Sequence, residues 1–270
     1  MPVAFRRNPR NPPGSARRRD GRVKLLSFRW APLALLTLVA AHPALAEGFR
    51  LDLEAGPVWQ TRNVFAVPGT TGTRISLADY DDGPFASGRA TLTWDFSPRW
   101  SARFVAAPLA VNVDFTPTAP VVFAGTTFPA GQPLNAGYRF NSWRMSGYYR
   151  FPSSSPLSFR LGLTAKVRDA RIDISGANGS AEKSDTGFVP LIYAGARWQL
   201  AEGFALDLES DALGAPQGRA IDVSLKGDWS VSRSVSLYAG GRVLDGGADN
   251  DEVFSFATFW YGFVGVGIRF

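Results

Sequence analysis

The chain ends with the sequence WYGFVGVGIRF, residues 260–270, and this stretch decides its fold class. In an extended strand, successive side chains point to opposite faces. One face of this strand carries large apolar side chains: Trp260, Val264, Val266, Ile268 and Phe270. The other face carries Tyr261, Phe263, Gly265, Gly267 and Arg269. This pattern fits a barrel closed within a membrane, because one face of each strand there meets lipid and the other meets the lumen.

The terminal strand also resembles the C-terminal strand of bacterial outer-membrane β-barrel proteins, where a final Phe after alternating apolar residues is the usual assembly signal. The resemblance implies a location in the outer membrane, with Phe270 as the assembly signal. It further implies outer-membrane lipid and the barrel-assembly machinery as partners. It assigns no function, and no functional subfamily is recognised in the rest of the chain.

The first 46 residues predict a cleaved secretory signal peptide. Eight basic residues lie in residues 1–24, an apolar run follows from Ala31 to Ala41, and Ala44-Leu45-Ala46 precedes Glu47. Basic, apolar and A-x-A regions in this order are typical of such signals. A membrane anchor is the alternative, but the apolar run is shorter than the ~20 residues that a spanning helix needs. Since the basic leader is long, translation from Val23 is a further hypothesis.

Removal of this segment changes the charge argument. The whole chain has 29 basic and 23 acidic residues, a net charge of +6. Nine basic residues and one Asp belong to residues 1–46, which leaves 29 − 9 = 20 basic and 23 − 1 = 22 acidic residues. A net charge of −2 does not indicate nucleic-acid binding. The only histidine, His42, leaves with the signal, and the chain has no cysteine.

Residues 47–270 predict one domain, an up-and-down antiparallel transmembrane β-barrel of ten strands, with eight as the alternative. The strands are expected at 49–62, 85–96, 100–113, 138–151, 158–174, 187–200, 204–212, 219–229, 234–245 and the terminal stretch. Short connections alternate with mostly longer ones at 63–84, 114–137, 175–186, 213–218 and 246–255. Short periplasmic turns and longer extracellular loops are typical of outer-membrane barrels. An even strand number places both termini in the periplasm.

Aromatic residues test this arrangement. Ten of them lie beside the proposed periplasmic turns or the terminus: Trp94, Phe96, Trp100, Tyr149, Phe151, Phe159, Trp198, Phe204, Trp229 and Phe270. All face lipid in the proposed register. A belt of rings at one membrane–water interface is expected from their amphipathic character.

The lumen-facing positions predict a charged interior. Basic residues come from two strands: Arg144, Arg150, Arg160, Lys166 and Arg168. Acidic residues come mainly from two others: Asp207, Glu209, Asp211, Asp222 and Asp228. One interpretation is an ion-pair network that fills the barrel. The other is a narrow pore whose opposite walls bear opposite charge.

Enzymatic activity is not expected. Omptin-like proteases, lipid A deacylases, palmitoyltransferases and phospholipases resemble this chain in size and topology, but all depend on a catalytic histidine. Residues 47–270 have none to serve as a general base near neutral pH. Acidic loop clusters at 79–83 and 245–252 could hold a hard cation, but the second lacks the ligand spacing of a calcium loop. No cofactor and no metal site is predicted.

Two further features bear on whether the lumen is open. Loop 114–137 is rich in apolar residues and prolines. It is expected to fold inward as a plug, with an exposed interaction surface as the alternative. Pro57, Pro108 and Pro190 lie at similar distances from the periplasmic strand ends, and proline cannot donate to a ladder. Hydrogen bonding in the wall should loosen there, at a frayed rim or at a lateral opening.

Together these observations predict a monomeric, non-enzymatic outer-membrane barrel with a structural or surface-interaction role and a largely filled, charged lumen. The alternative function is a small passive pore, or a channel with a lateral exit for small solutes.

Overall fold

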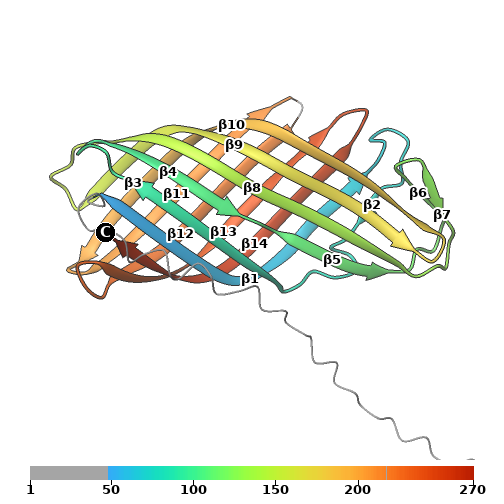
Figure 1. Ribbon diagram of the computed structural model, residues 1–270, viewed down its shortest axis with the longest axis horizontal. Helices are drawn as coiled ribbons and strands as arrows, with labels where there is room; N and C mark the ends of the chain where they lie inside the picture. The colour runs from blue at the N-terminus through green and yellow to red at the C-terminus, as the bar shows by residue number, and fades with distance from the viewer. Residues whose placement is uncertain (1–47, 217) are drawn as a thin grey trace, which may run out of the picture. The chain divides into compact units, whose positions relative to one another are not determined.

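The computed structural model describes residues 48–216 and 218–270, and these form a closed antiparallel barrel (Figure 1). The predicted ten-strand barrel is confirmed. Its strands are β1 (Phe49–Ala66), β3 (Phe85–Trp94), β4 (Trp100–Ala107) with β5 (Ala110–Phe115), β8 (Leu134–Arg150), β9 (Leu157–Gly176), β10 (Gly179–Ala201), β11 (Phe204–Ala215), β12 (Gly218–Ser230), β13 (Val235–Asp249) and β14 (Phe254–Arg269). The predicted signal peptide, residues 1–46, lies outside the described residues. No helix that is both long and apolar enough to cross a membrane occurs within the described ranges.

Sequential strands pair along the wall, and β14 pairs with β1 to close it. Three short strands lie outside this series: β2 (Ile75–Ser76), β6 (Val121–Phe123) and β7 (Thr126–Phe128). β2 pairs with β1, while β6 and β7 form a hairpin at the end of the barrel opposite the C-terminus (Figure 1). Phe49 and Phe270 exchange backbone hydrogen bonds of 3.1 and 3.0 Å, so the first and last described strands meet at the same end. We call this the terminal end and the opposite one the far end.

Several strands are longer than the sequence predicted. The expected loops at 175–186, 213–218 and 246–255 are mostly ladder, and the β9–β10 connection spans only residues 177–178. The third expected strand, 100–113, is divided into β4 and β5 instead of running through. These boundaries were missed because an antiparallel hairpin can continue beyond the membrane with polar residues on both faces, where hydrophobic alternation gives no signal.

The three prolines mark changes in the wall, as predicted. At Pro57 the β1–β14 ladder is interrupted, while the β1–β3 ladder continues. Pro108 separates β4 from β5. Pro190 lies just beyond the β10–β11 ladder, which reaches Ile192, so that β10 continues beside β9 alone. A missing amide donor at each proline accounts for the change.

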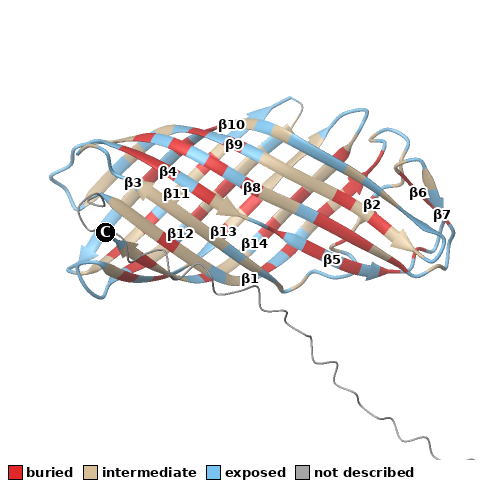
Figure 2. Ribbon diagram, in the orientation of Figure 1, coloured by how far each residue is buried: buried red, intermediate tan, exposed pale blue. Residues whose placement is uncertain are grey.

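The outer surface of the barrel is an apolar band with aromatic residues at both edges. Burial alternates residue by residue along the strands (Figure 2). Near the terminal end, the exposed aromatics include Trp94, Trp100, Phe159, Trp198, Trp229 and Phe270, which confirms the predicted belt. A second group near the other edge was not predicted: Trp59, Trp143, Phe188 and Trp260. At about 3.3 Å per residue and a tilt of about 40°, the step from Phe159 to Val167 rises roughly 20 Å, close to the apolar height of such barrels.

Candidate functional site in the barrel lumen

The lumen has a charged half at the terminal end and an apolar half at the far end. The charged half contains buried side chains of both signs, including Arg103, which is 2% exposed. The apolar half is a single cluster of packed side chains that includes Phe65, Phe123 and Phe259. We describe the charged half first, because it contains most of the residues expected from the sequence.

Arg144 on β8 lies at the centre of the charged half. Its guanidinium donates to Asp211 on β11 at 2.9 Å and to Asp222 on β12 at 2.5 Å. Arg103 on β4 donates to the same Asp211 at 2.7 Å. Arg242 on β13 approaches Asp222 at 3.4 Å. The contacts of Arg144 and Arg103 cross the lumen and connect strands that do not pair with each other, whereas Arg242 and Asp222 lie on neighbouring strands. The cross-lumen contacts brace the wall from within.

The chain of ion pairs continues from Arg103 toward the terminal end. Arg103 lies 3.4 Å from Glu209, and Glu209 lies 3.6 Å from Arg160. Arg160 is hydrogen-bonded to Asp207, which also accepts from Arg197 at 3.2 Å. Each carboxylate is therefore shared by two arginines, which is how a buried charge is compensated most fully.

At the opening of the lumen, Asp228 joins the chain to β1. It accepts from Arg197 at 3.2 Å and from Arg50 at 2.7 Å, and Arg50 also contacts Asp52 at 2.8 Å. Deeper in the lumen, Arg242 is paired with Glu54 on β1. Arg89 is connected to the same chain of ion pairs through Asp222, which lies 3.6 Å from its guanidinium. The connected set contains seven arginines and seven carboxylates, so its formal charges balance.

Seven of the ten charged residues selected from the sequence belong to this chain: Arg144, Arg160, Asp207, Glu209, Asp211, Asp222 and Asp228. The other three lie elsewhere. Arg150 pairs with Asp95 at 2.9 Å near the terminal end, and Arg168 pairs with Asp185 on β10. Lys166 is 2% exposed and has its ammonium 4.7 Å from the Phe140 ring centroid. The assembly-signal residue Phe270 stacks on Phe49 at the terminal end of the wall.

The sequence selection omitted seven members of the chain: Arg50, Asp52, Glu54, Arg89, Arg103, Arg197 and Arg242. All alternate with lipid-facing residues, so strand periodicity alone could have found them. Their presence overturns the interpretation that opposite walls bear opposite charge. Arginines extend from β1, β3, β10 and β13 as well as from β4, β8 and β9, and the two signs interleave around the lumen.

The apolar half contains the loop that was expected to act as a plug. Phe115, Val121, Phe123 and Phe128, all from residues 114–137, are buried in the cluster. Phe123 makes an edge contact with Phe65 of β1, with ring centroids 5.7 Å apart. The cluster also includes side chains from opposite walls of the barrel: Leu134, Tyr138, Ile172 and Ile174 from β8 and β9, and Leu244, Ala257 and Phe259 from β13 and β14. The folded loop and the inner strand faces thus close the far half with apolar packing.

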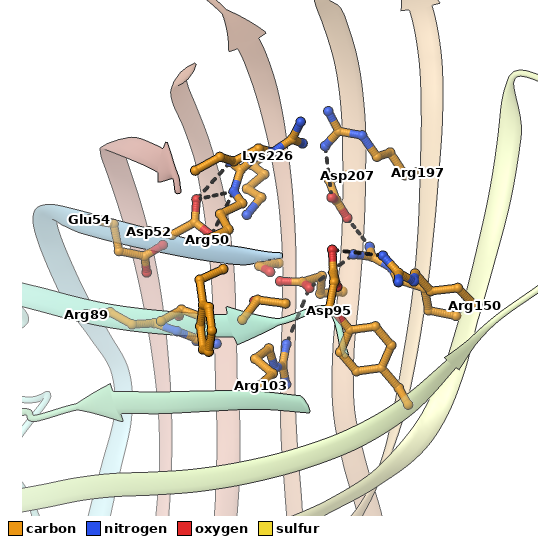
Figure 3. Close-up of a pocket in the computed structure, with 18 of the residues that line it drawn as sticks. Arg50, Asp52, Glu54, Arg89, Asp95, Arg103, Arg150, Arg197, Asp207 and Lys226 are labelled. Carbon is orange, nitrogen blue, oxygen red and sulfur yellow. Dashed lines mark hydrogen bonds and ion pairs between the residues drawn. The ribbon is translucent and has the colours of Figure 1, made fainter. Parts of the chain in front are cut away.

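A cavity of about 530 Å³ remains at the terminal end, and we call it the vestibule (Figure 3). Its lining includes Phe49, Ser234 and Phe270 near the strand ends and Glu54 and Arg89 deeper in the lumen. A second cavity, of about 30 Å³, lies deeper between Ser87 and Pro108. The vestibule is large enough for a small ligand.

The two acidic loop clusters have structural partners. In the first, Asp81 accepts a backbone hydrogen bond from Gly83 at 3.0 Å. In the second, Asp245 is hydrogen-bonded by Arg219 outside the apolar band, and this bond lowers the pKa of Asp245. Over residues 48–216 and 218–270, no group of three or more candidate ligands is arranged to hold a metal ion.

No protein-family model and no curated protein matches the sequence. Among solved structures, the barrel is similar to outer membrane protease OmpT from Escherichia coli, at 11% identity over 84% of this chain and 98% of that chain, with a TM-score of 0.50. Ail of Yersinia pestis covers 83% of this chain and 99% of its own, at 11% identity and a TM-score of 0.38. Neisserial surface protein A gives 14% identity, 83% and 99% coverage and a TM-score of 0.33.

At such identities the likeness to OmpT shows the fold alone. Together with the apolar outer band and its aromatic edges, this fold defines the class of the protein: a small bacterial outer-membrane β-barrel.

Proposed function

We propose that residues 47–270 form a non-enzymatic outer-membrane barrel with a closed lumen and a structural or surface-interaction role. The observation that carries this proposal is the blockage of the lumen beyond the vestibule. A continuous chain of ion pairs occupies the terminal half, and apolar packing occupies the far half. Barrels of this size leave an interior that side chains can fill.

The non-enzymatic part of the proposal rests on the lumen chemistry. Residues 47–270 include neither histidine nor cysteine. The carboxylates that could act as acid or base are bound to arginines: Asp211 to two of them, Asp222 to three and Glu209 to two. A carboxylate whose oxygens are bound by guanidinium groups is held in a structural role and is not free to contact a substrate.

The placement in the envelope is proposed from the asymmetry of the barrel ends. Turns at the terminal end are short, whereas the β9–β10 hairpin and the β6–β7 region extend at the far end. This difference supports termini in the periplasm. Phe270 closes the barrel against Phe49 and remains 42% exposed, which supports its role as the signal read by the barrel-assembly machinery.

We propose a monomer surrounded by lipid.

Surface interaction is proposed for the far end. There β8, β9 and β10 continue beyond the apolar band with charged side chains on their outer faces. Arg139 pairs with Asp169 at 3.3 Å, and Arg171 pairs with Glu182 at 2.7 Å. A polar, ordered extension of this kind offers a rigid surface outside the membrane.

A liposome-swelling assay with arabinose tests the closed lumen. The protein is extracted from membranes, its folding is verified by heat-dependent gel mobility, and it is reconstituted beside an open porin as the positive control. We expect no swelling above that of empty liposomes. Swelling at the rate of the porin would contradict the proposal.

A second candidate function, lateral release of a small apolar solute, is favoured by one observation. The β3–β4 ladder has only five residue pairs, from Ala90–Ala106 to Trp94–Ala102, whereas the β9–β10 ladder has twenty, from Gly179–Gly176 to Trp198–Leu157. The cavity of about 30 Å³ reaches Ser87 on one side of this seam and Pro108 on the other. The wall is therefore least continuous where the cavity approaches it.

The lateral route is tested by locking the seam. The chain has no native cysteine, so the variant Ala90→Cys/Ala106→Cys carries a single possible cross-link between paired residues. Uptake of an apolar fluorescent probe by cells is compared before and after oxidation. A lateral route predicts that oxidation abolishes the protein-dependent uptake, and unchanged or absent uptake would eliminate it.

A further inference from the structure

The vestibule has cationic side chains that the ion-pair chain does not satisfy. Its five lining carboxylates, Asp52, Glu54, Asp95, Asp207 and Glu209, each have an arginine partner. The lining contains nine basic residues. The lining of this cavity therefore carries more positive than negative charge.

Arg89 belongs to the balanced ion-pair chain, but its guanidinium lacks hydrogen bonds in the described part of the protein. Its side chain is only 7% exposed, its single charge partner is Asp222 at 3.6 Å, and its guanidinium makes no hydrogen bond within the described residues. Asp222 meanwhile accepts a hydrogen bond of 2.5 Å from Arg144. A buried guanidinium without hydrogen bonds is costly. Arg89 therefore has guanidinium donors without an acceptor, among the described residues, at the border of the vestibule.

Lys226 carries positive charge that the ion-pair chain does not balance. It extends from β12 on the same inner face as Asp222 and Asp228, and it lines the vestibule. No carboxylate of the described residues lies within 4.0 Å of its ammonium, which lies 4.8 Å from the Tyr238 ring centroid and interacts with Glu209 only at longer range. Figure 3 shows Lys226 and Arg89 among the side chains that border the cavity. Arg269, at the opening, also has no ion pair within the described residues.

The charge count indicates the kind of ligand. The nine basic lining residues and Arg144 behind them give ten positive charges. The five lining carboxylates with Asp211, Asp222 and Asp228 behind them give eight negative charges. Within this set the excess is 10 − 8 = 2 positive charges, those of Lys226 and Arg269, which one dianion neutralises. A phosphate monoester carries about −1.5 to −2 at neutral pH and several acceptor oxygens.

Hydroxyl donors complete the lining. Thr91 and Thr93 follow Arg89 on the inner face of β3, and both line the vestibule. Neither hydroxyl has a hydrogen-bond partner among the described side chains or backbone groups. The volume of about 530 Å³ exceeds that of a phosphate ion and accommodates a small organic group as well.

We propose that the vestibule binds a small solute that carries a dianionic phosphate group, held between Arg89 and Lys226 and entering from the terminal end. The closed lumen makes this a binding site and not a passage. Free phosphate and a phosphate monoester share the chemistry that the site recognises, so the test includes both.

The test is calorimetric titration of the detergent-extracted protein with inorganic phosphate and, separately, with glucose 6-phosphate, at low salt. We expect saturable binding at one site per chain, weakened at least ten-fold by Lys226→Met and by Arg89→Met. Lys226→Arg should retain binding within about three-fold, because the charge is kept. Lys183→Met is the matched control, since Lys183 pairs with Glu252 outside the vestibule, and it should bind like the wild type.

The Lys226 variants keep the test valid if Arg89→Met fails to fold, because Lys226 has no ion pair to lose within the described residues. Tighter binding of glucose 6-phosphate than of phosphate would identify a phosphate monoester as the ligand class. Tighter binding of phosphate would identify the free ion. Absence of saturable heat with both probes, or equal affinity in Lys226→Met and the wild type, would overturn the proposal.

Discussion

Arg144 on β8 and Asp222 on β12 meet across the lumen at 2.5 Å, with both side chains almost completely buried. The two residues lie 78 positions apart in the chain, on strands that do not pair with each other. Their contact therefore depends on the closed barrel, and it holds the two walls at a fixed separation.

Loss of Arg144 is expected to destabilise the barrel. Arg144→Met leaves Asp222 and Asp211 each with one fewer partner in a buried site, and removal of one member of a buried pair costs about 3–5 kcal/mol. Lys183→Met, which breaks the exposed pair with Glu252, should cost less than about 1 kcal/mol. Urea unfolding followed by tryptophan fluorescence in detergent measures both. Equal unfolding free energies in the two variants would show that the lumen contact contributes no stability.

The far-end packing should depend on Phe123 in particular. Its side chain is 0% exposed, whereas the adjacent Val122 is 36% exposed. Phe123→Ala removes the ring that packs against Phe65, and such a change costs about 3–5 kcal/mol of local packing. We expect rapid protease cleavage within residues 116–133, while Val122→Ala should resist cleavage like the wild type. Resistance in both variants would mean that the loop is held without this ring.

The barrel wall should open first at the seam between β3 and β4. This ladder has five residue pairs, and no strand pairs with β5 on the side away from β8 in the described chain. We expect the amides of Ala102–Ala106 to exchange with deuterium faster than those of β9, since fewer cooperative hydrogen bonds protect them. Mass spectrometry of exchanged peptides measures the difference. Uniform protection around the barrel would contradict this expectation.

Processing of the N-terminus is a separate prediction. Cleavage after Ala46 should give a mature protein that begins at Glu47, because Ala44-Leu45-Ala46 matches a signal-peptidase site. Intact mass spectrometry of the protein from outer membranes determines this end. A mature protein that retains residues before 47 would refute the proposed site.

The sequence predicted the strand number and the face of each strand because both depend on local alternation. The terminal stretch 260–270 shows this: Val264 is 66% exposed, while Phe263 is 6% exposed. The partners of the lumen charges could not be predicted. Alternation places Arg144 and Asp222 inside, but their meeting depends on the tilt and stagger of the closed barrel, which no local pattern encodes.

Two errors have different causes. Arg103 and Arg242 were overlooked although their strands point them inward, so a stricter use of periodicity would have found them. The β6–β7 hairpin and the outer part of the β9–β10 ladder lie beyond the apolar band, where lipid imposes no alternation on the sequence. Their structure follows from hairpin pairing and packing that the hydrophobic pattern does not reveal.

The central claim is that the lumen is closed, and single-channel recording in a planar lipid bilayer tests it most directly. The protein, extracted from membranes and verified as folded, should insert without producing stepwise currents, because ion pairs and apolar packing fill its interior. Stepwise openings whose conductance changes in Arg144→Glu or Arg168→Glu would instead establish an aqueous pore lined by those residues and contradict the account.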